Sequence, residues 1–349
     1  MSEAAPARHL APLIVLSACV LLGAVAVIAI GTGAVKIEPG KVLAILLGQA
    51  SPDVTEAQRV VVWSVRLPRV LLAIVAGAGL AITGVLMQAL FRNPLADPAL
   101  IGVSAGAALG AVTVIVLGAT VLQGASRLLG VWTLPAAAFT GALATALIVF
   151  RFSNRDGVLD PTTMLLCGIA INALSGAGIG LLTYLATDEQ LRNLTFWSLG
   201  SLSAATWGAL LGTLPAALAL ALAVPRVVLG LNALLLGESE ALHLGIPVEG
   251  LKRLVIALTA AAAGSVVAVS GVIGFVGLVC PHLARLLVGP NHRYVLPLAA
   301  ALGAILLTAG DMIARTVVRP AELPIGILTA LLGAPFFLWL LRRESAHGH

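Results

Sequence analysis

The sequence predicts an all-α, polytopic membrane protein with about ten transmembrane helices. Three observations point to this class: 60% of the 349 residues are hydrophobic, only 10% are charged, and the apolar residues form long unbroken runs. A soluble globular domain carries about 25% charged residues, so this chain has too little charge to cover a surface in water. A membrane β-barrel would alternate polar and apolar residues in short strands. A soluble enzyme and a disordered chain are excluded.

Each predicted span is an apolar segment close to the ~20 residues that cross a bilayer. The segments are 10–33, 69–91, 100–121, 131–152, 164–186, 207–228, 254–272, 271–289, 294–317 and 325–341. The first is longer than the 7–15 apolar residues of a signal peptide, so we expect it to be retained. The eighth is interrupted by Gly274, Gly277 and Pro281 and is expected to be short or broken.

The connections predict smaller elements. A short amphipathic piece is expected at 39–47 and an interfacial helix carrying Trp197 at 193–202. An even number of spans places both termini on one side, and Arg8, Arg342 and Arg343 favour the cytoplasm. The chain is therefore predicted to be a multi-pass protein of the bacterial inner (cytoplasmic) membrane, with both termini in the cytoplasm.

Charge and cysteine content suggest neither a nucleic-acid partner nor a metal site. The net charge is +5, and the cationic residues are scattered over loops and span ends. Membrane lipid is therefore the expected partner, and nucleic acid is not. Cys19, Cys167 and Cys280 all lie in apolar segments and are not spaced for a disulfide or zinc.

A weak internal repeat accompanies the ten spans. Segment 81–85 resembles 268–272, and 98–102 resembles 324–326, with opposite membrane orientation within each pair. Inverted repeats are common in transporters. We therefore expect one permease domain over residues 1–349, built from two inverted-repeat-like halves.

Motif residues occur in a fixed order along most of the chain. They are Arg66-Leu67-Pro68-Arg69 followed by Asn93-Pro94-Leu95-Ala96-Asp97-Pro98; the stretch 236–245; and 274–282 followed by Asp311, Arg315 and Ala321-Glu322-Leu323-Pro324-Ile325-Gly326. Together they resemble the permease family of type II ABC importers, which carry iron-siderophores, cobalamin and haem. The resemblance covers about residues 63–341.

The resemblance implies a functional homodimer with two cytoplasmic ATPase subunits and a periplasmic binding protein. ATP and Mg²⁺ would sit on the ATPase subunits, and no cofactor would be bound permanently to the permease. The permease itself would not be an enzyme and would have no catalytic residues. In agreement, the sequence has no Gly-x-x-x-x-Gly-Lys-Ser/Thr motif.

The polar segment 229–250 resembles the family's coupling segment, which contacts the ATPase. A short charged helix closed by glycine suits a rigid lever, and acidic residues near its start favour the helix dipole. The coupling residues implied are Gly237, Glu238, Glu240, Ala241, Leu244 and Gly245. The alternative is an ordinary solvated loop.

Two further sets of residues take roles from the resemblance. Arg66, Arg69 and Arg315 would dock the binding protein through its glutamates, with Arg319 as a neighbour that no motif supports. Their alternative role is snorkelling at span ends. Asn93, Leu95, Pro161 and Thr162 would form the cytoplasmic gate, or Asn93 and Thr162 would cap helices. Asp311 is expected to pair with Arg315 at i,i+4.

The haem branch of the family is the most similar in 191–202 and 280–297, so haem is the predicted cargo. Arg192 is the candidate for a haem propionate on the substrate path, and its alternative role is to fix the interfacial helix. Cys280-Pro281 resembles a haem-regulatory dipeptide, but Pro281-His282 belongs to the general family motif whatever the cargo, so no metal ligand is predicted. Cobalamin or a ferric siderophore is the alternative cargo, and an ion-gradient-driven secondary transporter is the alternative class.

Overall fold

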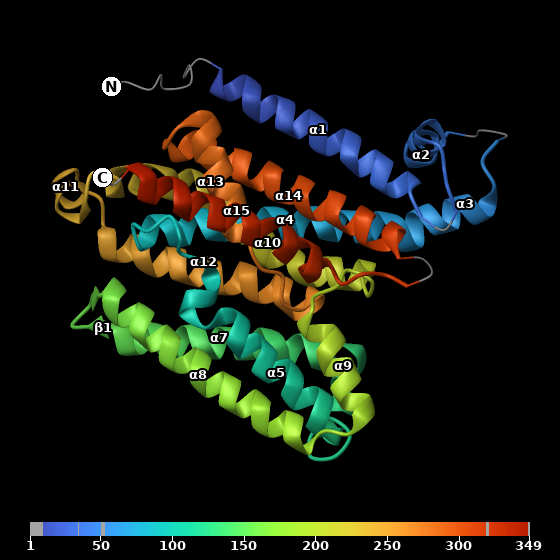
Figure 1. Ribbon diagram of the computed structural model, residues 1–349, viewed down its shortest axis with the longest axis horizontal. Coiled ribbons are helices and arrows are strands. Elements are labelled where there is room, and N and C mark those ends of the chain that lie inside the picture. Colours follow the sequence, from blue (N-terminus) through green and yellow to red (C-terminus); the bar gives the residue numbers. More distant parts are fainter. Residues whose placement is uncertain (1–9, 34, 50–52, 319–320, 348–349) are drawn as a thin grey trace. The chain divides into compact units, whose positions relative to one another are not determined.

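The computed structural model describes residues 10–33, 35–49, 53–318 and 321–347 (Figure 1). The helices are α1 (Ala11–Gly31), α2 (Pro39–Leu46), α3 (Glu56–Val60), the π-helix η1 (Val61–Arg66), α4 (Leu67–Leu90), the 3₁₀ turn η2 (Pro98–Ile101), α5 (Val103–Leu117), α6 (Gln123–Leu129), the 3₁₀ turn η3 (Gly130–Trp132), α7 (Thr133–Ser153), α8 (Pro161–Leu185), α9 (Asp188–Ser198), α10 (Trp207–Leu234), α11 (Glu238–His243), α12 (Val248–Ser270), α13 (Val276–Val288), α14 (His292–Val317) and α15 (Ile325–His347). Strands β1 (Asn154–Arg155) and β2 (Val158–Leu159) form one antiparallel hairpin. The all-α prediction is confirmed.

Every predicted span corresponds to an apolar helix of the described chain. Seven helical stretches are long and apolar enough to cross a bilayer, and three shorter apolar helices accompany them. The shorter ones are α5, α13 and the first part of α15. Helix α13 is the predicted short eighth span, and it has 13 residues. The number of spans is therefore close to ten only when these short helices are included.

Several predicted boundaries differ from the structure. The sixth span continues as α10 to Leu234, and α12 already begins at Val248. The predicted coupling segment 229–250 therefore includes the last turn of α10 and the first residues of α12. The helix expected at 193–202 is α9, which begins at Asp188 because Thr187 and Gln190 form a capping box.

The chain divides into two compact units, each assembled from separate stretches. Unit 1 comprises Met1–Ile82, Ser201–Leu214 and Ile273–His349, and unit 2 comprises Thr83–Gly200 and Pro215–Val272. Neither unit is a continuous half of the sequence. The two members of the weak repeat also differ locally. Segment 81–85 lies inside α4, whereas segment 268–272 contains the end of α12 at Ser270 and its C-cap Gly271.

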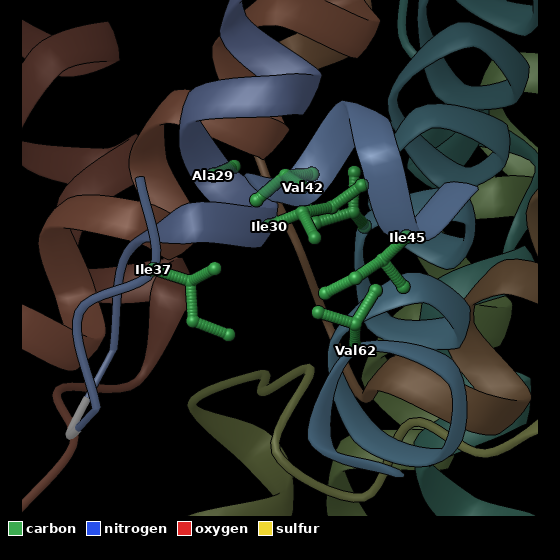
Figure 2. Close-up of a cluster of buried hydrophobic side chains, with 7 residues drawn as sticks. Ala29, Ile30, Ile37, Val42, Ile45 and Val62 are labelled. Atoms are coloured by element: carbon green, nitrogen blue, oxygen red, sulfur yellow. The ribbon is translucent and has the colours of Figure 1, made fainter. Parts of the chain in front are cut away.

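Unit 1 contains an apolar cluster at the end of α1 (Figure 2). Ala29 and Ile30 of α1 pack with Val42 and Ile45 of α2 and with Val62 of η1. Val42 and Ile45 are three residues apart and so share one face of α2. The amphipathic piece predicted at 39–47 thus buries its apolar face against its own chain. Elsewhere in unit 1, α1 and α14 lie side by side (Figure 1).

Unit 2 is built on α5, α7 and α8, with α12 packed against α7 and α5. Small residues allow close backbone contact between these helices. A Cβ added at Gly141 of α7 would lie 2.2 Å from the carbonyl oxygen of Gly106 in α5. A Cβ at Gly168 of α8 would lie 1.7 Å from the carbonyl oxygen of Leu100 in η2. The second of these close approaches holds η2, which follows the first predicted gate segment, against α8.

Candidate coupling segment, gate and docking arginines

The predicted coupling segment contains a one-and-a-half-turn helix held between two glycine turns. Gly237 precedes α11 at φ 117°, and Gly245 follows it at φ 80°. Side chains other than glycine rarely adopt either conformation. The N–H of Ile246 donates to Ala241 O and that of Gly245 to Leu242 O, at 3.0 and 2.9 Å. This is a Schellman motif, so the sequence prediction of a glycine-closed short helix is confirmed.

The residues of α11 and of the turn that follows it divide into a buried and an exposed set. Ala241 is fully buried, whereas Leu242 and Leu244 are 58% and 63% exposed. Leu235 and Leu236, at the turn before α11, are exposed as well. Apolar side chains exposed on a helix that also carries Glu238 and Glu240 form a surface suited to a protein partner.

Lys252 of α12 connects α11 to the β1–β2 hairpin. Its side chain is 2% exposed. Its ammonium group donates to Glu238 Oε2 at 2.8 Å and Glu249 Oε1 at 3.0 Å. A third bond goes to the carbonyl oxygen of Leu159 at 3.2 Å. Lys252 was not among the predicted site residues, although its i,i+3 spacing from Glu249 was an available signal.

The hairpin leads directly into α8, which carries Pro161 and Thr162. Asp160 caps α8, since its carboxylate accepts the backbone N–H groups of Thr162 and Thr163. The Thr163 hydroxyl also donates to Asp160. This hydroxyl bond, followed by the backbone bonds, lowers the pKa of the Asp160 carboxyl below its usual value. The helix cap is therefore Asp160, and the alternative of a cap at Thr162 is wrong.

The other predicted gate segment lies between α4 and η2. Asn93 is exposed, and its side-chain oxygen accepts the backbone N–H of Leu95 at 2.8 Å. This bond forms a tight Asx turn rather than capping a long helix. Among the described residues, no hydrogen bond joins Asn93 or Leu95 to Pro161 or Thr162. Within unit 2 the two segments are connected through η2, because Asn172 of α8 donates to Ala99 O at 3.2 Å.

The three predicted docking arginines are buried and bonded within unit 1. Arg69 donates three hydrogen bonds of 2.8 to 3.1 Å to Asp311. It donates two more to Glu322, at 3.1 and 2.9 Å. Asp311 is therefore a structural pairing residue, as expected. Its main partner, however, is Arg69, since Arg315 Nε lies 3.8 Å away.

Arg66 and Arg315 bind the carbonyl end of α1. Arg66 donates to Ile30 O at 2.8 Å and Gly31 O at 3.0 Å, and also to Val35 O. Arg315 donates to Ala29 O. The last carbonyls of a helix lack intrahelical partners and carry partial negative charge, so the two guanidinium groups stabilise this end of α1. Arg319 and Arg8 lie outside the described residues.

The candidates for cargo contact belong to different units and are described separately. Arg192 is exposed on α9, and Gln190 of the same helix donates to Val116 O at 3.1 Å. Cys280 is buried in α13, and the ring of His282 packs edge-on against Phe336, with centroids 5.9 Å apart. In the described part of the chain no three His, Cys, Asp or Glu residues form a group that could hold a metal.

Comparison with known proteins decides the family. Residues 20–343 match the FecCD transport family. The chain belongs to this family. The hemin transport system permease protein HmuU of Yersinia pestis is 49% identical to this FecCD permease over 290 residues, which cover 81% of the chain and 84% of the relative. The cobalamin import system permease protein BtuC of Halobacterium salinarum is 39% identical over 302 residues, or 86% and 79% of the two chains.

A solved structure supports the same conclusion. An inward-facing metal-chelate type ABC transporter superposes with a TM-score of 0.81 at 35% identity, covering 95% of this chain and 99% of that one. This FecCD permease is therefore the membrane subunit of a type II ABC importer and a multi-pass protein of the inner membrane. The predicted family is confirmed, and the alternative of an ion-gradient-driven secondary transporter is excluded. FecCD relatives work in importers with ATPase and substrate-binding partners.

Proposed function

We propose that this permease, as a homodimer, moves haem from a periplasmic binding protein into the cytoplasm. Two cytoplasmic ATPase subunits, which bind ATP and Mg²⁺, drive the movement, and both termini of the permease face them. The support for haem is the 49% identity to the hemin permease, against 39% to the cobalamin permease. Cobalamin is the second candidate because that relative also covers most of the chain.

The coupling segment of this machine is α11 with its flanking glycines: Gly237, Glu238, Glu240, Ala241, Leu244 and Gly245. The supporting observation is the exposure of Leu242 in α11 and of Leu244 directly after it, between the two glycine turns. With ten spans, α11 lies on the same side of the membrane as both termini. An ATPase groove that received these leucines would remove them from water, which is favourable by ~25 cal/mol per Å² of apolar surface.

Replacing Leu242 and Leu244 together by Glu is expected to abolish stable binding of the ATPase. The substitution removes two leucines from an apolar contact and places two glutamate charges there, which would be buried without partners. The measurement is co-purification of the ATPase with the permease, and ATP hydrolysis in proteoliposomes. Leu128→Glu is the matched control, because Leu128 is an exposed leucine of α6, on the opposite side of the membrane in this topology. Normal ATPase binding by the double variant would refute the assignment of α11.

The gate and docking roles complete the proposal. Asn93, Leu95, Pro161 and Thr162 close the cytoplasmic end of the path, and Asp160 anchors Pro161 and Thr162 at the start of α8. Arg66, Arg69 and Arg315 dock the binding protein. For these arginines the geometry supports a second, structural role, since all three are buried and bonded to their own chain.

Arg192→Ala is expected to slow haem uptake by about two- to fivefold, the size of an exposed ion pair. The exposed guanidinium group of Arg192 is proposed to form this ion pair with a haem propionate. Arg192→Lys should give an intermediate rate because lysine lacks the planar fork. Uptake by proteoliposomes loaded with binding protein and ATPase measures this, with Arg127→Ala of α6 as the exposed-arginine control. Uptake of cobalamin or a ferric siderophore without haem uptake would refute haem as the cargo.

A further inference from the structure

We infer that Lys252 is the positioning residue that transmits movement of α11 to the start of α8, and hence to the gate residues Pro161 and Thr162. The inference rests on the proposed coupling role of α11 and the proposed gate. It concerns one connection inside unit 2, formed by Glu238, Lys252 and Leu159.

The ammonium group of Lys252 has no hydrogen-bonding capacity left for another partner. Its three ammonium protons are used by Glu238, Glu249 and the Leu159 carbonyl. A buried ammonium is costly unless it is paired and fully hydrogen-bonded. Moving any one partner away therefore carries a free-energy penalty, so Glu238, Glu249 and Leu159 tend to move as one group.

Leu159 is hydrogen-bonded to α12 through both its N–H and its carbonyl oxygen. Its N–H donates to Glu249 Oε2 at 2.8 Å while its carbonyl accepts from Lys252. Arg253 adds a bond of 2.8 Å to Gly157 O in the hairpin turn. The hairpin is thus fixed to the first turns of α12 at two places, and it has little independent movement.

Leu159 lies only two residues before the predicted gate residue Pro161. Only Asp160 separates Leu159 from Pro161, and Asp160 is the cap of α8. The N–H of Asp160 donates to Ser153 O at 3.1 Å, which closes the hairpin. A displacement of Leu159 therefore reaches the first turn of α8 through two peptide bonds, with no flexible residue between them.

Glu238 makes the contact between α11 and Lys252. Glu238 is the first residue of α11, and its side chain is 38% exposed. It is the α11 side chain that bonds to Lys252, so it joins the surface proposed for the ATPase to the buried group. Coupling between sites is carried by packed and hydrogen-bonded contacts of this kind, and substitutions in them change it.

The experiment measures haem taken up per ATP hydrolysed by the permease reconstituted with its ATPase and binding protein. Lys252→Met keeps an unbranched side chain one atom shorter than lysine but removes all three bonds. Glu238→Ala removes only the bond to α11, and Glu238→Gln keeps a neutral acceptor at the same reach. Lys252→Arg keeps the charge. Glu189→Ala is the control, since Glu189 is an exposed carboxylate on the short helix α9.

Lys252→Met and Glu238→Ala are expected to lower uptake per ATP by about tenfold, within the range of such coupling changes. The double variant should be no worse than Lys252→Met alone, because both act through one connection. Lys252→Arg and Glu238→Gln should recover part of the loss. Hydrogen exchange at 158–163 should respond to nucleotide in the wild type but not in Lys252→Met, a difference that a merely structural role would not produce.

An unchanged ratio of uptake to hydrolysis in Lys252→Met, or losses that multiply in the double variant, would overturn the inference while leaving the proposed function intact. If Lys252→Met fails to assemble, Glu238→Ala decides the question by the same ratio. Absence of ATP-driven uptake by the wild-type complex would instead overturn the proposed function, and the inference with it.

Discussion

Asp311→Ala is expected to lower the free energy of unfolding of the permease by about 3–5 kcal/mol, the cost of breaking a buried ion pair by removing one partner. The carboxylate of Asp311 accepts three hydrogen bonds from Arg69 and lies near Arg315, and its side chain is 3% exposed. Its loss would leave two buried guanidinium groups close together. Thermal unfolding of the purified permease in detergent measures the effect.

Glu322→Ala is the matched control because Glu322 binds the same arginine from a more exposed position. An exposed ion pair contributes about 0–1 kcal/mol, so this variant should unfold at nearly the wild-type temperature. Equal losses in the two variants would contradict the view that burial makes Asp311 important.

A further variant, Arg69→Gln, separates the structural role of this arginine from docking. If Arg69 serves mainly the fold, Arg69→Gln should lower the unfolding temperature and the yield of assembled permease. If it also docks the binding protein, affinity should fall in the folded fraction and depend on salt. Normal stability with weaker, salt-dependent binding would overturn the structural assignment and favour docking.

The positions of the spans could be predicted because each depends on a local run of apolar residues. The glycines at 237 and 245 could also be placed, since a short helix between two chain reversals requires them. The partners of the charged residues could not be predicted in this way. Arg66 binds carbonyls 35 and 36 residues earlier in the chain, and nothing in the local sequence distinguishes such a residue from a snorkelling arginine.

Lys252 was missed although its spacing from Glu249 is local, because its burial also depends on residues far away in the chain. It precedes Arg253 in a polar stretch, and the predicted span began after it, at residue 254. Its burial depends on Leu159, which is 93 residues earlier. The capping box at Thr187 and Gln190 was visible in the sequence, and using it would have placed the start of α9 correctly.

Close packing of α4 and α14 makes Gly77 a position where a single methyl group is expected to be damaging. A Cβ added there would lie 2.2 Å from the carbonyl oxygen of Gly303. Neither backbone can move without displacing its helix, so Gly77→Ala should cost about 1–3 kcal/mol or more, as overpacking does. The unfolding temperature and the yield of folded permease measure the loss.

Gly23→Ala tests whether the loss at Gly77 is steric. Gly23 also lies inside a helix of unit 1, α1, but nothing lies within 4 Å of its added Cβ. Alanine is favoured over glycine in a helix by about 1 kcal/mol, so this variant should be as stable as the wild type or more so. Gly303→Ala should match Gly77→Ala, because its Cβ would meet the Gly77 carbonyl at 2.3 Å. A large loss at one of these two glycines but not the other would contradict a direct backbone contact.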